Sequence, residues 1–452
     1  MGQPLAWLPA CQGRLRCLLR PASWRCPEPV DRASGIGSSH GRASLPRGLT
    51  FRANLSWTFV GNVFYAGCQW GILILLAKVG SPEEVGQFSL GLAVTAPIIM
   101  LANLQLRAVQ ATDASCEYRF GDYLGLRLVM ATVAMLAIAC VVALSGYSTD
   151  TALVVLVLGL AKASESVSDI VFGLLQRNER MDRIAVSQLM RGCLSLVVLG
   201  VLVRATDSVL WGLLGMAASW LAVLLLYDIH NARRLTIARP RFDRRVLWQL
   251  GWVSLPLGVV MMLISLNSNI PRYFLQEYWG ERYLGYFSAM AYIIVAGSTV
   301  VGAVGQVATP RLAAYYAVGD AVAFRRLLIR VAAVAAGLGA AGVLIACLFG
   351  RHVLTLLYRA DYSEYSGVLV WLAIAAAVGY VGSALGYGIT ATRRFGSFLV
   401  PYLIVTVVVL ICCRLWIPRL GLLGAAYATL VKGVAMLVAP LLILRMSQED
   451  EQ

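Results

Sequence analysis

The segment 159–183, GLAKASESVSDIVFGLLQRNERMDR, carries ionisable side chains at the end of an apolar run that is long enough to cross a bilayer. Lys162, Glu165 and Asp169 follow one another at steps of three and four residues, so a helix would place them on one face. Each ionised group that faced lipid would cost about 2.5–3.5 kcal/mol. We therefore expect this face, extended by Ser166, to contact protein or water.

Two interpretations of this face are open. Lys162 and Glu165 could form an ion pair that fixes helix packing, or the face could be a polar cavity wall that offers a cation to an anionic cargo. The second interpretation is favoured because intramembrane ionisable residues usually mark a transport pathway. Glu165 and Asp169 would then tune the local charge or couple transport to an ion.

Lys432 and Arg191 are further cations expected inside apolar segments. The chain has three lysines, and Lys432 is expected at a depth similar to that of Lys162, roughly 16 Å from the outer membrane surface. If Glu165 neutralises Lys162, these cations lack an equal number of acids, although Asp169 could neutralise one more. Lys162, Arg191 and Lys432 are therefore predicted to bind an anionic substrate. Arg191 could equally extend its guanidinium to the inner headgroups.

A polar cluster lies at the end of another apolar segment, in SLNSNIPRYFL. Asn267, Asn269 and Arg272 are too hydrophilic for a lipid-facing position. They are candidates for substrate binding through sugar hydroxyls, or they hold neighbouring helices together.

The composition predicts an all-α polytopic membrane protein. The 452 residues are 59% hydrophobic and 13% charged, whereas soluble domains carry about 25% charged residues. A net charge of +15 would indicate nucleic acid in a soluble protein. Here most basic residues fall in short loops, where they act as topology signals and contact anionic membrane lipids, so no nucleic-acid partner is expected. The three histidines lie outside the apolar segments and no cysteine pair has zinc-site spacing, so neither a metal nor a cofactor is expected.

About twelve apolar segments have the length of a membrane span. Their approximate limits are 54–77, 86–106, 123–146, 151–175, 185–203, 208–227, 247–271, 284–306, 328–349, 366–390, 397–417 and 421–444. Arginines concentrate in alternate loops, near 107–119, 177–183, 233–245, 325–326 and 393–394. The positive-inside rule makes these loops, and both termini, cytoplasmic.

The spans divide into two halves that overlay at an offset of roughly 200 residues, as in transporters built from repeats. GQFS at 86–89 matches GYFS at 285–288, and Gly121-Asp122 matches Gly319-Asp320. We expect an N-lobe at 51–229, a basic cytoplasmic linker at 230–246, a C-lobe at 247–445 and an acidic tail at 446–452. Residues 1–50 have no continuous apolar core and are expected to be disordered or translated upstream sequence.

Several stretches resemble polysaccharide transporter flippases, the Wzx-type or O-antigen flippases of the MOP exporter superfamily. They are KASESVSDIVFGLLQRNERMDRIAVSQLMRG at 162–192, GSPEEVGQFSLGLAVTAPIIMLANLQLR at 80–107, GERYLGYFSAMAYI at 280–293 and ITATRRFG at 389–396. The resemblance covers residues 50 to 445 and implies a MATE-like pair of six-helix lobes around a cationic cavity. It implies a lipid-linked oligosaccharide as cargo, with a polyprenyl pyrophosphate head, moved by alternating access across the bacterial inner membrane.

For this cargo the resemblance implies that Lys162, Arg191 and Lys432 contact the head group. It also implies a role in surface polysaccharide assembly (lipopolysaccharide O-antigen, capsule or exopolysaccharide), with a polysaccharide polymerase and chain-length machinery as expected partners. One alternative is a MATE-type multidrug or cation exporter, whose cavity should carry an excess of acids. A peptidoglycan-precursor flippase is another. An enzyme that modifies polysaccharide is less favoured, because the sequence has no catalytic His/Asp group and no large outer loop.

Overall fold

The computed structural model describes residues 50–113, 117–391 and 399–449, and these form helices joined by short connections, without strands. Residues 1–49, Arg393 and Arg394, and the last three residues of the acidic tail lie outside the described residues. The bounds are α1 Phe51–Val79, α2 Pro82–Asn103, α3 Leu106–Thr112, α4 Phe120–Leu144, α5 Thr149–Arg177, α6 Met181–Thr206, α7 Val209–Val223, η2 Leu224–Asp228, α8 Ile229–Arg233, α9 Arg244–Val318, α10 Ala321–Leu357, η3 Ala360–Tyr365, α11 Ser366–Ala391, α12 Leu399–Leu420 and α13 Leu422–Glu449.

The predicted all-α membrane fold is confirmed. The predicted spans fall on these helices, with 208–227 divided between α7 and η2. Helix α9 contains two spans because its chain bends at Gly280, where φ is 78°. A positive φ of this kind suits glycine, which lacks a Cβ. In the described part of the chain, nine helical stretches are long and apolar enough to cross a membrane. Helix α5, with 29 residues, is also long enough, but it carries the charged residues Lys162, Glu165 and Asp169.

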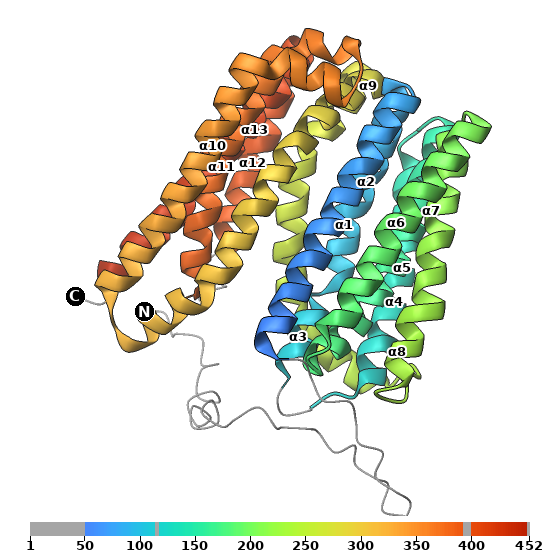
Figure 1. Cartoon of the computed structure of the whole chain (residues 1–452), viewed down its shortest axis with the longest axis vertical. Coiled ribbons are helices and arrows are strands. Elements are labelled where there is room, and N and C mark those ends of the chain that lie inside the picture. Colours follow the sequence, from blue (N-terminus) through green and yellow to red (C-terminus); the bar gives the residue numbers. More distant parts are fainter. Residues whose placement is uncertain (1–49, 114–116, 392–398, 450–452) are drawn as a thin grey trace, which may run out of the picture.

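The helices form two lobes (Figure 1). Helices α1 to α8 form the N-lobe, in which α5 packs against α2, α4 and α7. The second half of α9 (281–318) joins α10 to α13 in the C-lobe, where α11 packs against α10 and α13. The first half of α9 (244–279) touches both lobes: Tyr273 donates a hydrogen bond to Ala93 O of α2, and the Trp279 indole donates one to Ile417 O of α12 at 2.9 Å.

The two lobes share a core at one end of the molecule only. We call the end at which α1 ends and α2 begins the upper end, as it is drawn in Figure 1. There, buried apolar side chains form one cluster that includes Leu90 of the N-lobe and Phe287 of the C-lobe. At the lower end two separate clusters occur, one in the N-lobe with the start of α9 and one in the C-lobe. The start of α1 and the end of α13 both lie at the lower end (Figure 1), so the two helices enter and leave on the same side.

The GQFS motif of α2 and the matching GYFS motif of α9 meet at the upper end. A Cβ atom added to Gly86 would lie 1.9 Å from Glu281 O, and one added to Gly285 would lie 2.0 Å from Pro82 O. The contact is reciprocal, because Pro82 precedes Gly86 by one helical turn, as Glu281 precedes Gly285. Only glycine permits so close an approach of two backbones. We call this contact the glycine seam.

The glycine seam predicts a specific effect of added volume. Gly86→Ala should force α2 away from the α9 bend and lower the free energy of unfolding by about 1–3 kcal/mol, the usual cost of overpacking. Gly67→Ala is the matched control, because nothing lies within 4 Å of its added Cβ. Thermal unfolding of the purified variants in detergent measures both effects. Equal stability of the two variants would contradict the seam.

Candidate functional site

The charged face of α5 lies inside the N-lobe. Lys162 Nζ is 2.8 Å from Glu165 Oε2, which forms the expected ion pair, and the Tyr65 hydroxyl donates a hydrogen bond to Glu165 Oε1 at 2.7 Å. The Lys162 ammonium also lies 5.1 Å from the centroid of the Trp220 ring. The two charged side chains are 26% and 27% exposed. Lys162 therefore has an internal counter-ion, as the structural interpretation required.

Asp169 neutralises arginines that were not predicted to be its partners. Its carboxylate lies 3.3 Å from Arg107 Nη1 and 3.4 Å from Arg127 Nη2, so it joins α5 to α3 and α4. Arg127 is almost completely buried and also donates to Asn103 Oδ1. Ser166 donates to the same Asn103 oxygen at 2.7 Å. The predicted polar stripe thus faces protein, and Asp169 does balance positive charge.

Arg191 is closed off inside the N-lobe. Its Nη2 donates to Ser168 Oγ at 2.6 Å and lies 3.1 Å from Asp228 Oδ2, and Arg191 and Asp228 are 2% and 0% exposed. This corrects both expectations for Arg191, since a buried and paired guanidinium neither reaches headgroups nor meets a cargo in this structure. Asp228 escaped sequence reasoning because the predicted span ended one residue before it. It lies in the π-helical turn η2, and such turns are frequent at functional sites.

The polar cluster of α9 divides into packing and charged parts. Asn267 is fully buried and its amide lies 3.4 Å from Tyr402 O of α12, so it holds two helices together and meets no cavity. Asn269 is nearly buried as well, but its Oδ1 accepts a hydrogen bond from Arg272 Nη1 at 2.5 Å. Of the two predicted asparagines, only Asn269 therefore touches a cation.

Arg272 of the first half of α9 and Lys432 of α13 form a cationic cluster, which we call the C-lobe cluster. Lys432 Nζ is 3.4 Å from Ser268 Oγ, one helical turn before Arg272 on α9. The Arg272 guanidinium lies 5.9 Å from the centroid of the Tyr292 ring. Within residues whose side chains are described, neither cation has a carboxylate within ion-pair distance, unlike Lys162 and Arg191. Lys162 and Lys432 thus belong to different lobes and different clusters.

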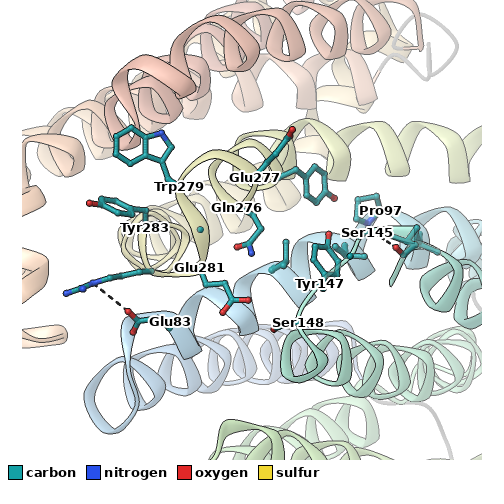
Figure 2. A pocket seen from close by; sticks show the side chains of 18 of the residues that line it. Glu83, Pro97, Ser145, Tyr147, Ser148, Gln276, Glu277, Trp279, Glu281 and Tyr283 are labelled. Atoms are coloured by element: carbon teal, nitrogen blue, oxygen red, sulfur yellow. Dashed lines mark hydrogen bonds and ion pairs between the residues drawn. The ribbon is translucent and has the colours of Figure 1, made fainter. Parts of the chain in front are cut away.

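A large groove opens at the upper end between α2, the α4–α5 turn and α9 (Figure 2). Its volume is about 1250 Å³, and we call it the α2–α9 groove. The apolar lining is deep and includes Leu90, Pro97, Ile98 and Leu266, whereas polar and aromatic residues line the end near Gly280. Sequence reasoning missed this groove because its walls come from three separate segments. In the part of the chain that the structure describes, no three His, Cys, Asp or Glu residues gather as metal ligands.

The sequence matches a known protein family. A family model described as "Polysaccharide biosynthesis protein" matches residues 51–316. The "Capsular polysaccharide biosynthesis protein CapF" of Staphylococcus aureus is 26% identical over 388 residues, which cover 85% of this chain and 97% of that protein.

Solved structures of transporters have the same fold. A lipid II flippase, MurJ, in an inward closed conformation has a TM-score of 0.72 at 10% identity and covers 86% of this chain, with 87% of its own chain matched. A MOP superfamily transporter from Pyrococcus furiosus has a TM-score of 0.61 at 16% identity, over 87% of this chain and 94% of its own. An inward-facing MATE family multidrug transporter has a TM-score of 0.58 at 15% identity, over 90% and 97%. The predicted MATE-like, two-lobed fold is confirmed, and these neighbours are transporters or flippases rather than enzymes.

The Arg191–Asp228 pair should behave as a structural unit. Asp228→Asn leaves a buried guanidinium without its counter-charge and should lower the free energy of unfolding by about 3–5 kcal/mol. Removing both charges in Arg191→Met with Asp228→Leu should cost less than the single change, because no unpaired ion remains. Thermal unfolding in detergent measures the series. A double variant that is less stable than Asp228→Asn would contradict the assignment.

The Lys162–Glu165 pair allows a test of its two interpretations. If the pair fixes packing, Lys162→Ala lowers transport and protein stability together, and adding Glu165→Gln restores both. A Lys162 that binds cargo would leave transport low in the double variant. We expect restoration, because the geometry neutralises Lys162 internally. Cell-surface glycan and thermal unfolding of the purified variants are the two measurements.

Proposed function

The chain belongs to the polysaccharide biosynthesis protein family, and from this premise we propose that it flips a polyprenyl-pyrophosphate-linked oligosaccharide across the inner membrane by alternating access. The relative CapF is named for capsular polysaccharide biosynthesis, and MurJ is named as a flippase of lipid II. Both names support a lipid-linked saccharide as the cargo class. Its delivery to the far leaflet would serve the assembly of a cell-surface polysaccharide.

The uncompensated cations Lys432 and Arg272 are the observation that carries this proposal. A charge taken out of water loses several kcal/mol of solvation unless a counter-charge replaces it. Described residues provide no carboxylate for either cation, so an anionic ligand would complete the site. A pyrophosphate has two phosphates, and arginine can bind one of them in a bidentate manner while lysine acts as a point charge. Arg272 donates to Asn269 and Lys432 to Ser268. Each cation keeps further N–H groups that can donate to the ligand.

The N-lobe charges have a different part in this proposal. Lys162 and Arg191 are each paired with a carboxylate, Glu165 and Asp228, so neither of these two predicted cations is free to meet the pyrophosphate. Asp169, 30% exposed between Arg107 and Arg127, and Glu165 remain the proposed sites of charge tuning or ion coupling. Cargo binding is therefore assigned to the C-lobe cluster, with the N-lobe networks as internal supports.

The unequal sharing of the core supports alternating access. The lobes have one common apolar cluster at the upper end and separate clusters at the lower end. A hinge at the shared end would let the lower ends part, and the seam would have to open for the opposite state. The arginine-rich connections that the structure describes lie at the lower end, so we place this end, with both termini, in the cytoplasm. Polymerase and chain-length machinery are the proposed partners at the other face.

An exporter of organic cations suits the charges less well. Such a cargo requires carboxylates in excess of cations at its site. In the described residues the N-lobe networks show no excess of carboxylates, since Asp169 faces two arginines, and the C-lobe cluster is cationic. The protein therefore has a MATE-like fold, but the positive charge of its C-lobe cluster is the charge expected for an anionic cargo.

Removal of either C-lobe cation tests the proposal. Lys432→Ala and Arg272→Ala should each lower surface glycan by about tenfold to a hundredfold, the loss expected for one hydrogen bond to a charged group. Polyprenyl-linked glycan should accumulate in the cytoplasmic leaflet. Lys432→Arg keeps the charge and should retain much of the activity, and Arg351→Ala removes an exposed cation elsewhere in the C-lobe and is the matched control. Normal export in both alanine variants would refute the cationic site.

A further inference from the structure

The α2–α9 groove has the features of a lipid site. We infer that it binds a zwitterionic phospholipid with an amine head group, such as phosphatidylethanolamine, from the leaflet at the upper end. This inference goes beyond the proposed cargo, which is anionic and is assigned to the C-lobe cations. It is argued from the depth of the groove, its apolar walls and the charges at its open end.

The groove extends across the depth of one leaflet. Leu266 lies about 21 Å below the bend at Gly280, and Leu90 about 12 Å below the start of α2, at the helical rise per residue. One leaflet contributes about 15 Å of hydrocarbon. The deep walls, formed by Leu90, Pro97, Ile98 and Leu266, thus lie at the level of acyl chains.

Apolar walls at this depth fit a chain and not water. The side chains of Ile98, Val141 and Leu266 are partly exposed in the groove. Water in a cavity needs several polar partners, which these walls do not offer. An acyl chain would contact both α2 of the N-lobe and α9, so an occupant holds the two lobes together along this line.

The open end of the groove carries both signs of charge. Arg282 is 60% exposed, and its only ion pair with a described residue is a 3.7 Å contact with Glu83, so a phosphate can approach the guanidinium. Glu277 lies on the other side of the Gly280 bend, is exposed, and has no counter-ion within ion-pair distance in the described residues. The phosphate of a zwitterionic head group would face Arg282 and its ammonium would face Glu277. A purely anionic head group would instead be repelled by the uncompensated Glu277.

Aromatic rings complete the ammonium side of the site. Tyr147, Tyr273, Trp279 and Tyr283 line the same end, and Trp279 packs edge-on against Tyr283 with 5.2 Å between centroids. The Trp279 N–H is already bonded to Ile417 O, which fixes the ring. Ring faces and a carboxylate together are the usual surroundings of a bound ammonium.

An amide in the groove lacks its partner. Gln276 Oε1 is buried and accepts no hydrogen bond from described residues. Figure 2 shows the Gln276 amide extending from the α9 bend toward the side that carries Tyr147. A primary ammonium or a glycerol hydroxyl can donate to this oxygen, and a trimethylated ammonium cannot. The proposal therefore names an ethanolamine head and not a choline head.

The test compares lipids that share their acyl chains. The full-length protein in detergent is titrated with palmitoyl-oleoyl phosphatidylethanolamine or with palmitoyl-oleoyl phosphatidylglycerol, and thermal unfolding is followed. The ethanolamine lipid should raise the apparent Tm by at least about 3 °C more than the glycerol lipid, since a ligand of the folded state raises stability by mass action. Native mass spectrometry should show one ethanolamine lipid retained.

Two glutamates at the upper end provide the matched variants. Glu277→Gln removes the ammonium partner and should abolish the extra shift with the ethanolamine lipid, leaving the response to the glycerol lipid unchanged. Glu364→Gln changes an exposed acid outside the groove and should leave both responses as in the wild type. Equal shifts with the two lipids in the wild type, or equal losses in the two variants, would overturn the proposal. Loss of glycan export is not a readout here, so the proposed function is tested separately.

Discussion

The low dielectric constant of the bilayer constrains every ionised side chain in this protein. A charge in a span needs a counter-charge, a hydrogen-bonding shell or water, because lipid offers none of these. The N-lobe meets this constraint with internal ion pairs that converge on one helix. Helix α5 provides Lys162, Glu165 and Asp169, and their partners tie it to α1, α3 and α4. The buried Arg191–Asp228 pair connects α6 to the π-helical turn beside it.

The C-lobe treats its charges differently, and this difference gives the two lobes separate tasks. Arg272 and Lys432 are held by neutral hydrogen-bonding groups, which fix the position of a cation without cancelling its charge. A lobe whose charged side chains are tied together by ion pairs can act as a rigid support. An unbalanced cluster gains most from an anionic ligand. A transport cycle of this kind would load cargo on one lobe and move it against the other.

Features that depend on one segment were predictable from the sequence. The apolar lengths located each span, because a bilayer fixes how many residues a helix needs to cross it. The GQFS and GYFS repeats located two segments that meet in space. Partners from other segments were not predictable: Arg107 and Arg127 contact Asp169 only because α3 and α4 fold against α5. The α2–α9 groove was hidden for the same reason, since its shape depends on how three segments pack.

Asp228 shows how a small boundary error changes a charge count. It directly follows the predicted span, yet it ends the π-helical turn and lies in the core, where it neutralises Arg191. In a prediction from sequence, an acid at the edge of an apolar segment should therefore be considered as a counter-ion for a buried cation on the neighbouring helix. Asn267 shows the reverse case, because a polar residue in a span can serve helix packing alone.

The glycine seam has the form of an isologous interface. Each half presents the same surface to the other, so the residue that Gly86 touches in the second half is the counterpart of the residue that Gly285 touches in the first. Two-fold homodimers are built in this way. Two identical six-helix halves could form the same contact as a two-fold pair, and their union in one chain allows each half to carry different side chains. The ion-paired N-lobe and the C-lobe cations without a carboxylate partner among the described residues are differences of this kind.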